Sequence, residues 1–415
     1  MKQRLIVLSA DSMVYEDLEY LKKLPNYNKY LAGGAEIKKV RTIYPSLTIP
    51  AHASISTGNY PGRHGIISNS PLVTEKSDPN LMHYYSSLKC QDIFDAAKKK
   101  SLVTSGISWP LTGKHPSIDY LLSTCRDHSL GETFIEAQKI NGSCDAMIKI
   151  MEKYANESLV DKKSPGFDDF KINCACDVIR QFKPELLMIH PLNIDNYRHH
   201  YGLFNDMVTR GIEETDDYIG RIFRAAEEAG IDKEINFFLV SDHGQLEIKR
   251  RVNINVLLAE RGLIRINAES KVSDWDAYFF STGLSGLVFI KDPLDKKLYG
   301  KVNDVLRELC EAEVYGIERV FSKEEIFKNE HLSGDFSFVI ESDGFTAFSG
   351  GISKTTHGHL PEKGPQPVLI AKGPLIKENV LLERGLIVDE APTFAKILGL
   401  ELPDTVGIAI DEILK

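Results

Sequence analysis

The sequence lacks an apolar run that could span a membrane or form the core of a signal peptide. Near the N-terminus, the stretch MKQRLIVLSAD contains only the short run LIVL, which is interrupted at once by Ser9 and Asp11. Signal-peptide cores and membrane-spanning helices both need longer apolar segments. We therefore expect a cytoplasmic protein with no membrane partner.

Cysteine is also scarce, with six residues in a chain of 415. Only Cys174 and Cys176 lie close together, and a C-x-C pair in an apparently helical stretch directs its sulfurs to different faces. This spacing argues against a disulfide framework or a zinc knuckle. We expect free, buried thiols at all six positions, which are Cys90, Cys125, Cys144, Cys174, Cys176 and Cys310.

A block rich in lysine and arginine is missing as well, and the formal net charge is −9. This balance argues against a nucleic-acid-binding groove, so a phosphate-bearing substrate would need local attraction by bound cations. Composition is otherwise ordinary for a soluble protein, with 42% hydrophobic and 26% charged residues. The length allows either one large domain with insertions or two domains.

Buried-strand patterns alternate with helical patterns through most of the chain. Leu5–Leu8, Leu186–Ile189 and Ile235–Val240 are short apolar runs typical of parallel strands covered on both faces. The alternation predicts an α/β fold with a mostly parallel sheet. Further predicted elements are the strands Leu102–Trp109 and Pro367–Ala371, and the helices Gln91–Lys99, Glu132–Tyr154, Phe167–Phe182, Asp206–Glu228 and Glu390–Leu398.

The pattern changes between about residues 251 and 345. Two candidate strands, Gly286–Ile290 and Phe336–Ile340, flank the predicted helix Lys301–Ala312 and are surrounded by charged loops. We interpret residues 251–345 as a smaller α+β cap inserted into a catalytic core of residues 1–250 and 346–415. The core carries a further inserted helical segment at about residues 111–175.

The stretch Tyr44–Asn69 places a hydroxyl at the start of a predicted helix. Thr48 precedes Pro50, and proline is tolerated in the first helical turn because its missing N–H has no partner there. The N–H groups of a helix start favour an anion beside Thr48, and Asn69 is placed to return as an amide donor. Alone, the stretch favours a threonine N-cap followed by a glycine-rich surface loop, because threonine caps greatly outnumber threonine nucleophiles.

Three acidic residues closely follow predicted buried strands: Asp11, Asp195 and Asp242. Open α/β sheets bind their ligands at the carboxyl ends of the strands, so these carboxylates are expected to converge. Any one of them alone would be an ordinary turn or cap residue. Their joint occurrence at successive strand ends indicates a shared site.

Histidines accompany these carboxylates. Asp195 and His199 are four residues apart and face the same side if that segment is helical, His243 directly follows Asp242, and His357 lies among small residues. Carboxylate and imidazole ligands without thiolate suit zinc, with manganese or iron as alternatives.

The motifs form a set that covers nearly the whole core. They are Asp11; Tyr44-Pro45 with Thr48, Pro50 and His52; Thr57-Gly58, His64-Gly65 and Asn69; Asp195 with His199; Ser241-Asp242-His243-Gly244; His357-Gly358; and Asp389-Glu390-Ala391-Pro392-Thr393. This set resembles the alkaline phosphatase superfamily and, within it, the type I phosphodiesterase/nucleotide pyrophosphatase family. The resemblance implies an alkaline phosphatase-like sandwich, with a central, mostly parallel sheet flanked by helices.

The resemblance also implies two divalent metal ions, with zinc favoured and manganese as the alternative. The implied ligands are Asp195, His199 and His357 for one ion, and Asp11, Asp242, His243 and the Thr48 oxygen for the other. Thr48 would attack phosphorus to form a phosphothreonine, while Asn69 and a backbone N–H near Thr48 donate to the non-bridging oxygens. The expected function is hydrolysis of small phosphate diesters or nucleotide pyrophosphates.

Several positions depart from the family pattern. Ile49 and His190 stand where nucleotide-cleaving relatives usually carry aromatic residues that clamp the base, which weakens stacking on a nucleobase. Arg198 replaces a usual glycine; it either contacts a second phosphate or is solvated, and we favour solvation. Trp109 either lines the substrate pocket or belongs to the core. His52, His64 and His359 are interpreted as structural hydrogen-bonding residues.

Alternative functions remain open at the level of the sequence. A phosphonoacetate hydrolase-like enzyme would share the metal residues but need a basic group for a carboxylate, for which Lys114 is the one nearby candidate. A phosphomonoesterase acting on a small non-nucleotide substrate, or a metal-binding protein without turnover, would also retain these ligands. The sequence leaves the oligomeric state undetermined.

Overall fold

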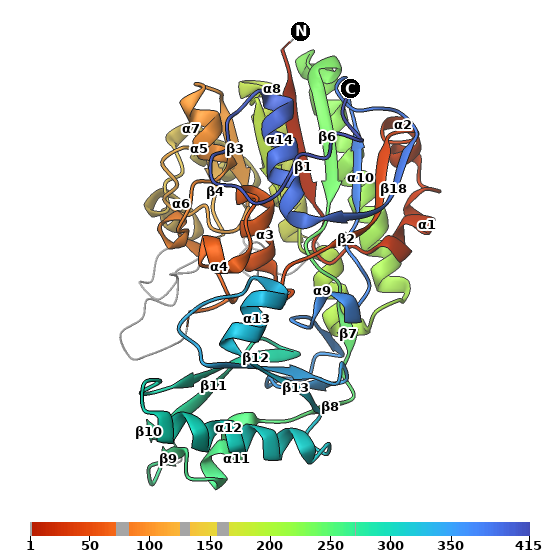
Figure 1. Cartoon of the computed structure of the whole chain (residues 1–415). Coiled ribbons are helices and arrows are strands. Elements are labelled where there is room, and N and C mark those ends of the chain that lie inside the picture. Colours follow the sequence, from red (N-terminus) through yellow and green to blue (C-terminus); the bar gives the residue numbers. More distant parts are fainter. Residues whose placement is uncertain (1, 72–82, 125–132, 156–165, 270) are drawn as a thin grey trace.

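The computed structural model describes residues 2–71, 83–124, 133–155, 166–269 and 271–415 (Figure 1). Its main sheet has eight strands, and β17 alone among them pairs antiparallel with its neighbours. This arrangement confirms the predicted α/β fold with a mostly parallel sheet. In spatial order the strands are β18 (Val380–Leu386), β2 (Ala35–Arg41), β17 (Leu369–Lys372), β6 (Ile235–Val240), β1 (Arg4–Ser9), β5 (Leu186–Ile189), β3 (Thr104–Ile107) and β4 (Tyr120–Leu122).

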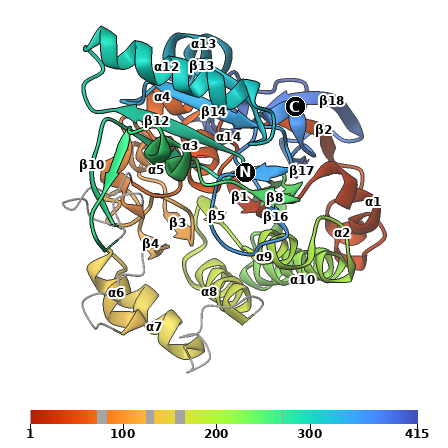
Figure 2. The same ribbon diagram turned by 90° about the horizontal axis from the view of Figure 1, so that it is seen from below.

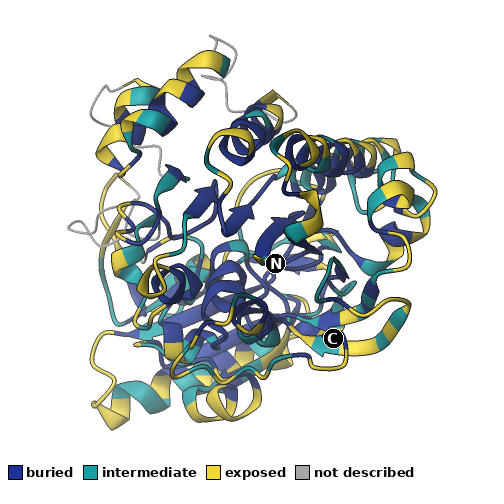
Figure 3. Cartoon of the chain, turned by 90° about the horizontal axis from the view of Figure 1, so that it is seen from above, coloured by how far each residue is buried: buried dark blue, intermediate teal, exposed yellow. Residues whose placement is uncertain are grey.

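Helices cover both faces of this sheet, so its central strands are buried throughout (Figure 3). In β1, Leu5 and Val7 belong to one core and Ile6 and Leu8 to the other, as the period of two of a strand requires. Helices α3 (Thr48–Thr57), α5 (Ile93–Lys99) and α14 (Glu390–Leu398) pack on the first face. The other face is covered by α1 (Leu18–Leu21), α2 (Pro25–Tyr30), α6 (Phe134–Ile140), α7 (Asp145–Tyr154), α8 (Gly166–Phe182) and α10 (Asp206–Ala229).

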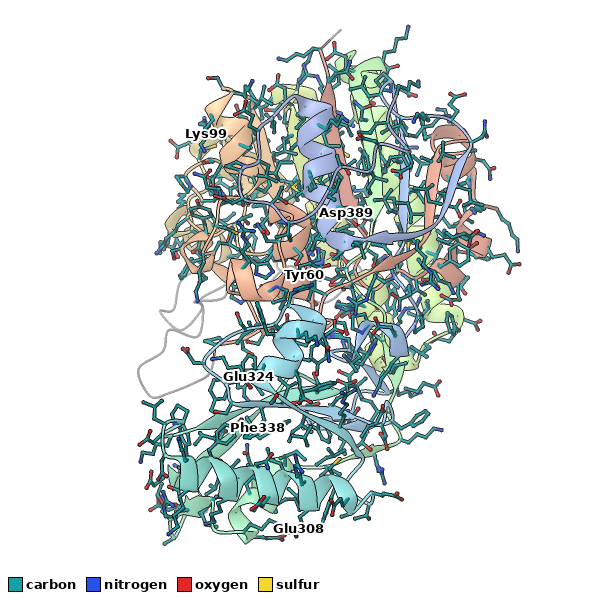
Figure 4. The ribbon with its side chains drawn as sticks, viewed as in Figure 1. Tyr60, Lys99, Glu308, Glu324, Phe338 and Asp389 are labelled. Atoms are coloured by element: carbon teal, nitrogen blue, oxygen red, sulfur yellow. The ribbon has the colours of Figure 1, made fainter. Side chains whose placement is uncertain are left out.

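A second, antiparallel sheet forms below the main domain (Figures 1 and 2). Its strands in spatial order are β11 (Ala277–Ser281), β12 (Ser285–Ile290), β14 (Phe338–Ser342) and β13 (Ile317–Ser322). Phe338 on β14 packs against Tyr299 with ring centroids 4.7 Å apart, in the core between this sheet and its long helix (Figure 4). The accompanying elements are α11 (Ile254–Glu260), β9 (Ile264–Ile266), β10 (Val272–Trp275), α12 (Lys296–Glu311) and α13 (Lys323–Glu330).

The second sheet is held against the carboxyl edge of the main sheet. The hydroxyl of Tyr44 donates to Oε2 of Glu341 at 2.9 Å, and the N–H of Leu284 donates to the carbonyl of His357 at 3.1 Å. Two short ribbons, β7 (Leu246–Glu247) with β16 (Thr355–Thr356) and β8 (Arg250–Arg251) with β15 (Thr346–Ala347), lie where the chain enters and leaves this cap. The cap therefore borders the segment that begins with Thr48.

Two sequence-based expectations need correction, and one strand of the main sheet was missed. The predicted helix Glu132–Tyr154 is instead two helices, α6 and α7, because Gly142 between them has a φ of +100° that a helix cannot contain. The supposedly helical insertion also contributes β4 to the main sheet. Strand β18 was not predicted, since it is a charged edge strand without a buried apolar run.

The described thiols are free as expected, but only two of these five are buried as expected. Cys174 and Cys176 are free and buried, whereas Cys90, Cys144 and Cys310 are free and half-buried. Cys125 and the predicted helix start at Glu132 lie outside the described residues. Within the described part of the chain, all helices are too short or too polar to cross a membrane.

Candidate metal centre

The three strand-associated carboxylates meet at one edge of the main sheet. Asp11 follows β1 and Asp242 follows β6, and these strands are adjacent and parallel. Asp195 lies in the first turn of α9 (Asn193–Tyr201), directly after β5, the other neighbour of β1. The predicted convergence is therefore present, and it follows from the strand order β6-β1-β5.

Thr48 begins helix α3 at this edge. The N-cap is Leu47, with extended backbone, so the Thr48 side chain does not cap the helix. Its Oγ1 instead lies 3.1 Å from Nε2 of His243. This contact excludes the alternative in which Thr48 is an ordinary N-cap, and it places the hydroxyl against the carboxylate and histidine cluster.

Asn69 also reaches the start of α3. Its Oδ1 accepts a hydrogen bond from the N–H of Ile49 at 2.9 Å, so its amide Nδ2 remains as the donor. The Ile49 N–H is therefore already engaged and cannot bind a substrate oxygen. The donors left at the helix start are the Asn69 amide and the N–H of Thr48 itself.

Asp11, Asp242 and His243 form what we call the inner group. Their ligand atoms lie within 4.8 Å of one another, and all three residues are buried. Nε2 of His243 is 3.2 Å from Oδ2 of Asp242 and 3.6 Å from Oδ1 of Asp11. The N–H of Ser12 donates to Oδ1 of Asp242 at 3.0 Å, which fixes that carboxylate.

Asp195, His199 and His357 form the outer group, whose ligand atoms also lie within 4.8 Å of one another. The helical spacing of four brings Nε2 of His199 to 3.4 Å from Oδ1 of Asp195. Nδ1 of His199 donates to the carbonyl of Thr355 at 2.8 Å, which leaves Nε2 unprotonated in the neutral ring and directed at the group. The His357 ring stacks on His243 at 4.1 Å and so joins the two groups.

Burial dominates the electrostatics of the inner group. Burial, and next the neighbouring Asp242 carboxylate, raise the pKa of Asp11 well above its usual range. Burial also raises the pKa of Asp242, and it lowers the pKa of His243 well below its usual range. Carboxylates crowded together in this way are stabilised in their charged form by a bound cation.

The hydrogen bonding points to the same chemistry. Oδ1 of Asp11, Oδ2 of Asp242 and Nδ1 of His357 are buried without a hydrogen-bond partner in the described structure. Buried polar atoms are normally paired, so unpaired atoms in the same cluster need an explanation. Two sets of carboxylate and imidazole donors, with no thiolate among them, fit a pair of divalent cations such as zinc or manganese.

The comparisons with known proteins agree with this geometry. The family model "Type I phosphodiesterase / nucleotide pyrophosphatase" matches residues 5–359, a span that contains both groups. The chain belongs to this family. Curated proteins similar to the chain are named as phosphodiesterases or pyrophosphatases.

Those relatives are distant and longer. Ectonucleotide pyrophosphatase/phosphodiesterase family member 1 of Rattus norvegicus is 25% identical over 251 residues, which cover 59% of this chain and 24% of that protein. Venom phosphodiesterase 2 of Crotalus adamanteus is 25% identical over 401 residues, which cover 90% of this chain and 43% of that protein. The chain thus spans less than half the length of either relative.

Solved structures resemble the whole chain. Murine ectonucleotide pyrophosphatase/phosphodiesterase 5, an inactive variant in complex with AMP, matches with a TM-score of 0.73 and 17% identity, covering all of both chains. The human protein of the same name matches with a TM-score of 0.71 and 16% identity. These similarities confirm the alkaline phosphatase-like fold.

A cavity of about 350 Å³, which we call the apolar pocket, borders Thr48. Ile49 and His190, the two positions that depart from the family pattern, both line it, together with Pro110 and Leu192. Trp109 is 1% exposed and packs in the core, edge-on to His52 at 4.8 Å. The structure therefore favours the interpretation of Trp109 as a core residue behind the pocket.

His190 has a second contact that the sequence did not predict. Its Nε2 lies 3.0 Å from Oδ2 of Asp11, so the residue touches both the apolar pocket and the inner group. The carbonyl of His190 accepts a hydrogen bond from the buried ammonium of Lys171 at 3.1 Å. Lys171 is also paired with Asp168 at 2.7 Å, deep beneath the site.

Arg198 corrects another expectation, because it is neither solvated nor directed at a phosphate. The residue is 1% exposed, and its guanidinium donates to Oδ2 of Asp17 at 2.5 Å and to the carbonyls of Ser12 and Leu203. Arg198 therefore braces the loop after β1 that carries Asp11. No periodic pattern in the sequence signals such a role.

Gln245 is a further residue that the motif analysis missed. Its amide donates to Oδ1 of Asp195 at 2.6 Å, and Thr355 bonds its other end. The only available signal was that a polar residue closely follows the Asp242-His243 pair.

The remaining histidines behave as expected. His52 contacts Ser9 Oγ at 2.9 Å and the Thr48 carbonyl at 2.8 Å, and His64 contacts Ser54 Oγ at 3.1 Å. Nδ1 of His359 donates to the carbonyl of Leu360 at 2.8 Å. These contacts agree with structural roles for all three.

Proposed function

We propose that this chain is a binuclear metal-dependent hydrolase of phosphate diesters or nucleotide pyrophosphates, with Thr48 as the nucleophile. The observation that carries the proposal is the contact of 3.1 Å between the Thr48 hydroxyl and the inner group at a helix start. The residues that would hold the two ions are Asp11, Asp242, His243 and the Thr48 oxygen for one, and Asp195, His199 and His357 for the other.

The chemistry then has two displacements. Bound divalent ions supply the positive charge that lowers the pKa of a hydroxyl or water and offsets the charge of the phosphate. Thr48 Oγ1 gives its proton to solvent water and attacks phosphorus. The bond from phosphorus to the leaving oxygen breaks, and this oxygen keeps the electron pair and takes up a proton from water where its basicity requires one. Water then attacks the phosphothreonine, which releases the second product and restores the Thr48 hydroxyl. The Asn69 amide donates to a non-bridging oxygen in both steps.

The comparisons with known proteins support the reaction class, but they do not identify the substrate of this chain. Relatives that match this chain are named phosphodiesterases or pyrophosphatases. The murine structural neighbour that binds AMP is described as inactive through a threonine-to-alanine change. Zinc is favoured over manganese by the imidazole and carboxylate ligands.

Lys114, the basic residue that the phosphonoacetate hydrolase-like alternative requires, does not line the apolar pocket. Lys114 is exposed, and its ammonium lies 4.8 Å above the Tyr84 ring rather than among the residues that line the apolar pocket. A carboxylate-bearing phosphonate would therefore lack the counter-charge that this alternative requires.

The test uses metal-stripped protein with zinc or manganese added back. Hydrolysis is measured on bis(p-nitrophenyl) phosphate, p-nitrophenyl thymidine monophosphate and p-nitrophenyl phosphate. The proposal predicts that at least one of the two diesters is the best substrate and that activity depends on added metal. Preference for the monoester would favour a phosphomonoesterase, and failure of all three with either metal would contradict the proposal.

A further inference from the structure

A second cavity, of about 250 Å³, lies between the metal centre and the cap. Asn69 and His357 border it, so a group bound there sits beside the reacting phosphate. The cap contributes the turn between β11 and β12, and the core contributes the segments on either side of the site. Its volume is about eight times the ~30 Å³ that a water molecule occupies in the liquid, which suits a substituent of a few carbon and oxygen atoms.

The lining of this cavity, which we call the hydroxyl pocket, is rich in hydroxyl groups. Six of its eleven lining residues carry one: Ser68, Ser70, Ser281, Thr282, Ser349 and Thr356. The Ser68 hydroxyl donates to the Ser70 carbonyl, and the Thr282 hydroxyl bonds Ser285 Oγ at 2.7 Å. A hydroxyl both donates and accepts hydrogen bonds, so a lining of this kind is complementary to ligand groups that do the same. Phe280 adds an apolar surface against which carbon atoms can pack.

Charge complementarity excludes an anionic group. The described residues that line the hydroxyl pocket include no lysine, arginine, aspartate or glutamate. The guanidinium of Arg251 donates to the hydroxyl of the lining residue Ser349 at 3.3 Å, but it does not itself line the pocket. Its other hydrogen bonds go to the carbonyls of Ser349, Gly350 and Ser353, at 3.0, 3.1 and 2.9 Å, and to the Ser353 hydroxyl at 3.0 Å. An additional phosphate or carboxylate placed in this pocket would lose water without gaining a cationic partner from the described lining residues.

The apolar pocket provides the contrast. It borders Thr48, and its lining combines Ile49, Pro110 and Leu192 with two histidines and the hydroxyls of Ser108 and Thr124. The hydroxyl pocket borders Asn69 and His357 and has a larger share of hydroxyl residues. The two cavities therefore border one centre with different chemistry. This arrangement fits a phosphodiester with two unlike substituents better than a monoester, which would leave a cavity unused.

We propose that the hydroxyl pocket binds a neutral, polyhydroxylated substituent of a phosphodiester, such as a glyceryl group. The inference rests on the proposed function and narrows it, since a pyrophosphate substrate with its second charge in this pocket is disfavoured.

Binding to the zinc-loaded Thr48→Ala variant tests the inference without turnover. Calorimetry compares glyceryl, methyl and carboxymethyl p-nitrophenyl phosphate, which differ in one substituent. The glyceryl ester is expected to bind about tenfold more tightly than the methyl ester, as one or two hydrogen bonds would give. The carboxymethyl ester is expected to bind no more tightly than the methyl ester.

Pocket variants locate the effect. Adding Ser281→Leu fills the pocket and should bring the glyceryl-to-methyl affinity ratio to about one. Ser273→Leu is the matched control, because Ser273 is exposed on β10 in the same cap and does not line the pocket. Thr356→Val removes a lining hydroxyl at nearly constant volume and should also lower the ratio if Ser281→Leu disturbs folding.

Equal affinities for the glyceryl and methyl esters, tighter binding of the carboxymethyl ester, or a ratio untouched by both pocket variants would each overturn the inference. These outcomes are separate from failure of the proposed function. If the ratio holds while protein with Thr48 intact hydrolyses none of the esters, the pocket assignment stands and the hydrolase assignment fails.

Discussion

The inner and outer groups differ in how the fold holds them. Asp11, Asp242 and His243 follow two adjacent central strands and are at most 1% exposed. In the outer group, the side chains of His199 and Asp195 are 22% and 12% exposed, and they belong to a helix rather than to strand ends. Under the proposed mechanism, the buried inner group would hold the nucleophile and the more open outer group would admit water.

The largest expected effect comes from breaking the inner group. Asp242→Asn should lower kcat/KM on a diester by roughly a thousandfold or more, because metal-assisted activation of Thr48 is lost. The same change should raise the melting temperature of the metal-free protein, since it removes a carboxylate that is buried beside Asp11. Steady-state kinetics and calorimetric melting measure both effects. A metal-free variant less stable than the wild type would contradict the electrostatic argument.

Breaking the outer group should cost less and leave the inner ion in place. His199→Ala is expected to lower kcat by about a hundredfold to a thousandfold and to reduce bound zinc from two ions to one. His200→Ala is the matched control, because His200 is exposed on the same helix and its Nδ1 donates to the Asn196 carbonyl, away from the outer group's ligand atoms. The number of zinc ions that remain bound after dialysis distinguishes the His199→Ala variant from the His200→Ala variant. Loss of both ions in His199→Ala would show that the groups are not separable.

The support of the outer group offers a smaller perturbation. Gln245→Ala removes the amide that orients Asp195, and partners of this kind typically contribute 10-fold to 100-fold in metal affinity. We expect a loss of about that size in the affinity for the ion at the outer group alone. Competition with a coloured chelator gives the two affinities, and equal losses at both sites would argue against a local role.

The smallest effect expected is in the pH dependence of stability. Raised pKa values of Asp11, Asp195 and Asp242 mean that the metal-free fold keeps protons that the unfolded chain releases, so stability falls as pH rises above about 4. Lowered pKa values of His243 and His357 make stability fall as pH drops below 6.5. Zinc competes with protons at all these groups, so the rise in melting temperature on adding zinc should grow from pH 5 to pH 7.5. A pH-independent rise would contradict this assignment of the ligands.

The inner group was predictable from the sequence because its geometry follows from regular structure. A buried apolar run ending in an acidic residue is a local signal, and the parallel sheet brings such ends together. Asp195 and His199 were predictable for a similar reason, since helical spacing alone sets their relation.

The remaining features depend on tertiary contacts that carry no local signal. Arg198 is buried because Asp17, far away in sequence, supplies a partner, and the pattern around it is that of a solvated helix face. The engagement of the Ile49 N–H by Asn69 and the contact between His190 and Asp11 likewise depend on how separate segments pack. The hydroxyl pocket could not be predicted either, since it combines residues of the core with a cap turn.

The central claim is that Thr48 carries the phosphoryl group between two displacements. The stereochemical course at phosphorus tests it most directly, using a chiral phosphorothioate diester hydrolysed in isotopically labelled water. Each in-line displacement inverts the configuration, so a mechanism with a phosphothreonine intermediate predicts overall retention. Overall inversion would contradict the claim, because it requires direct attack of water on the substrate.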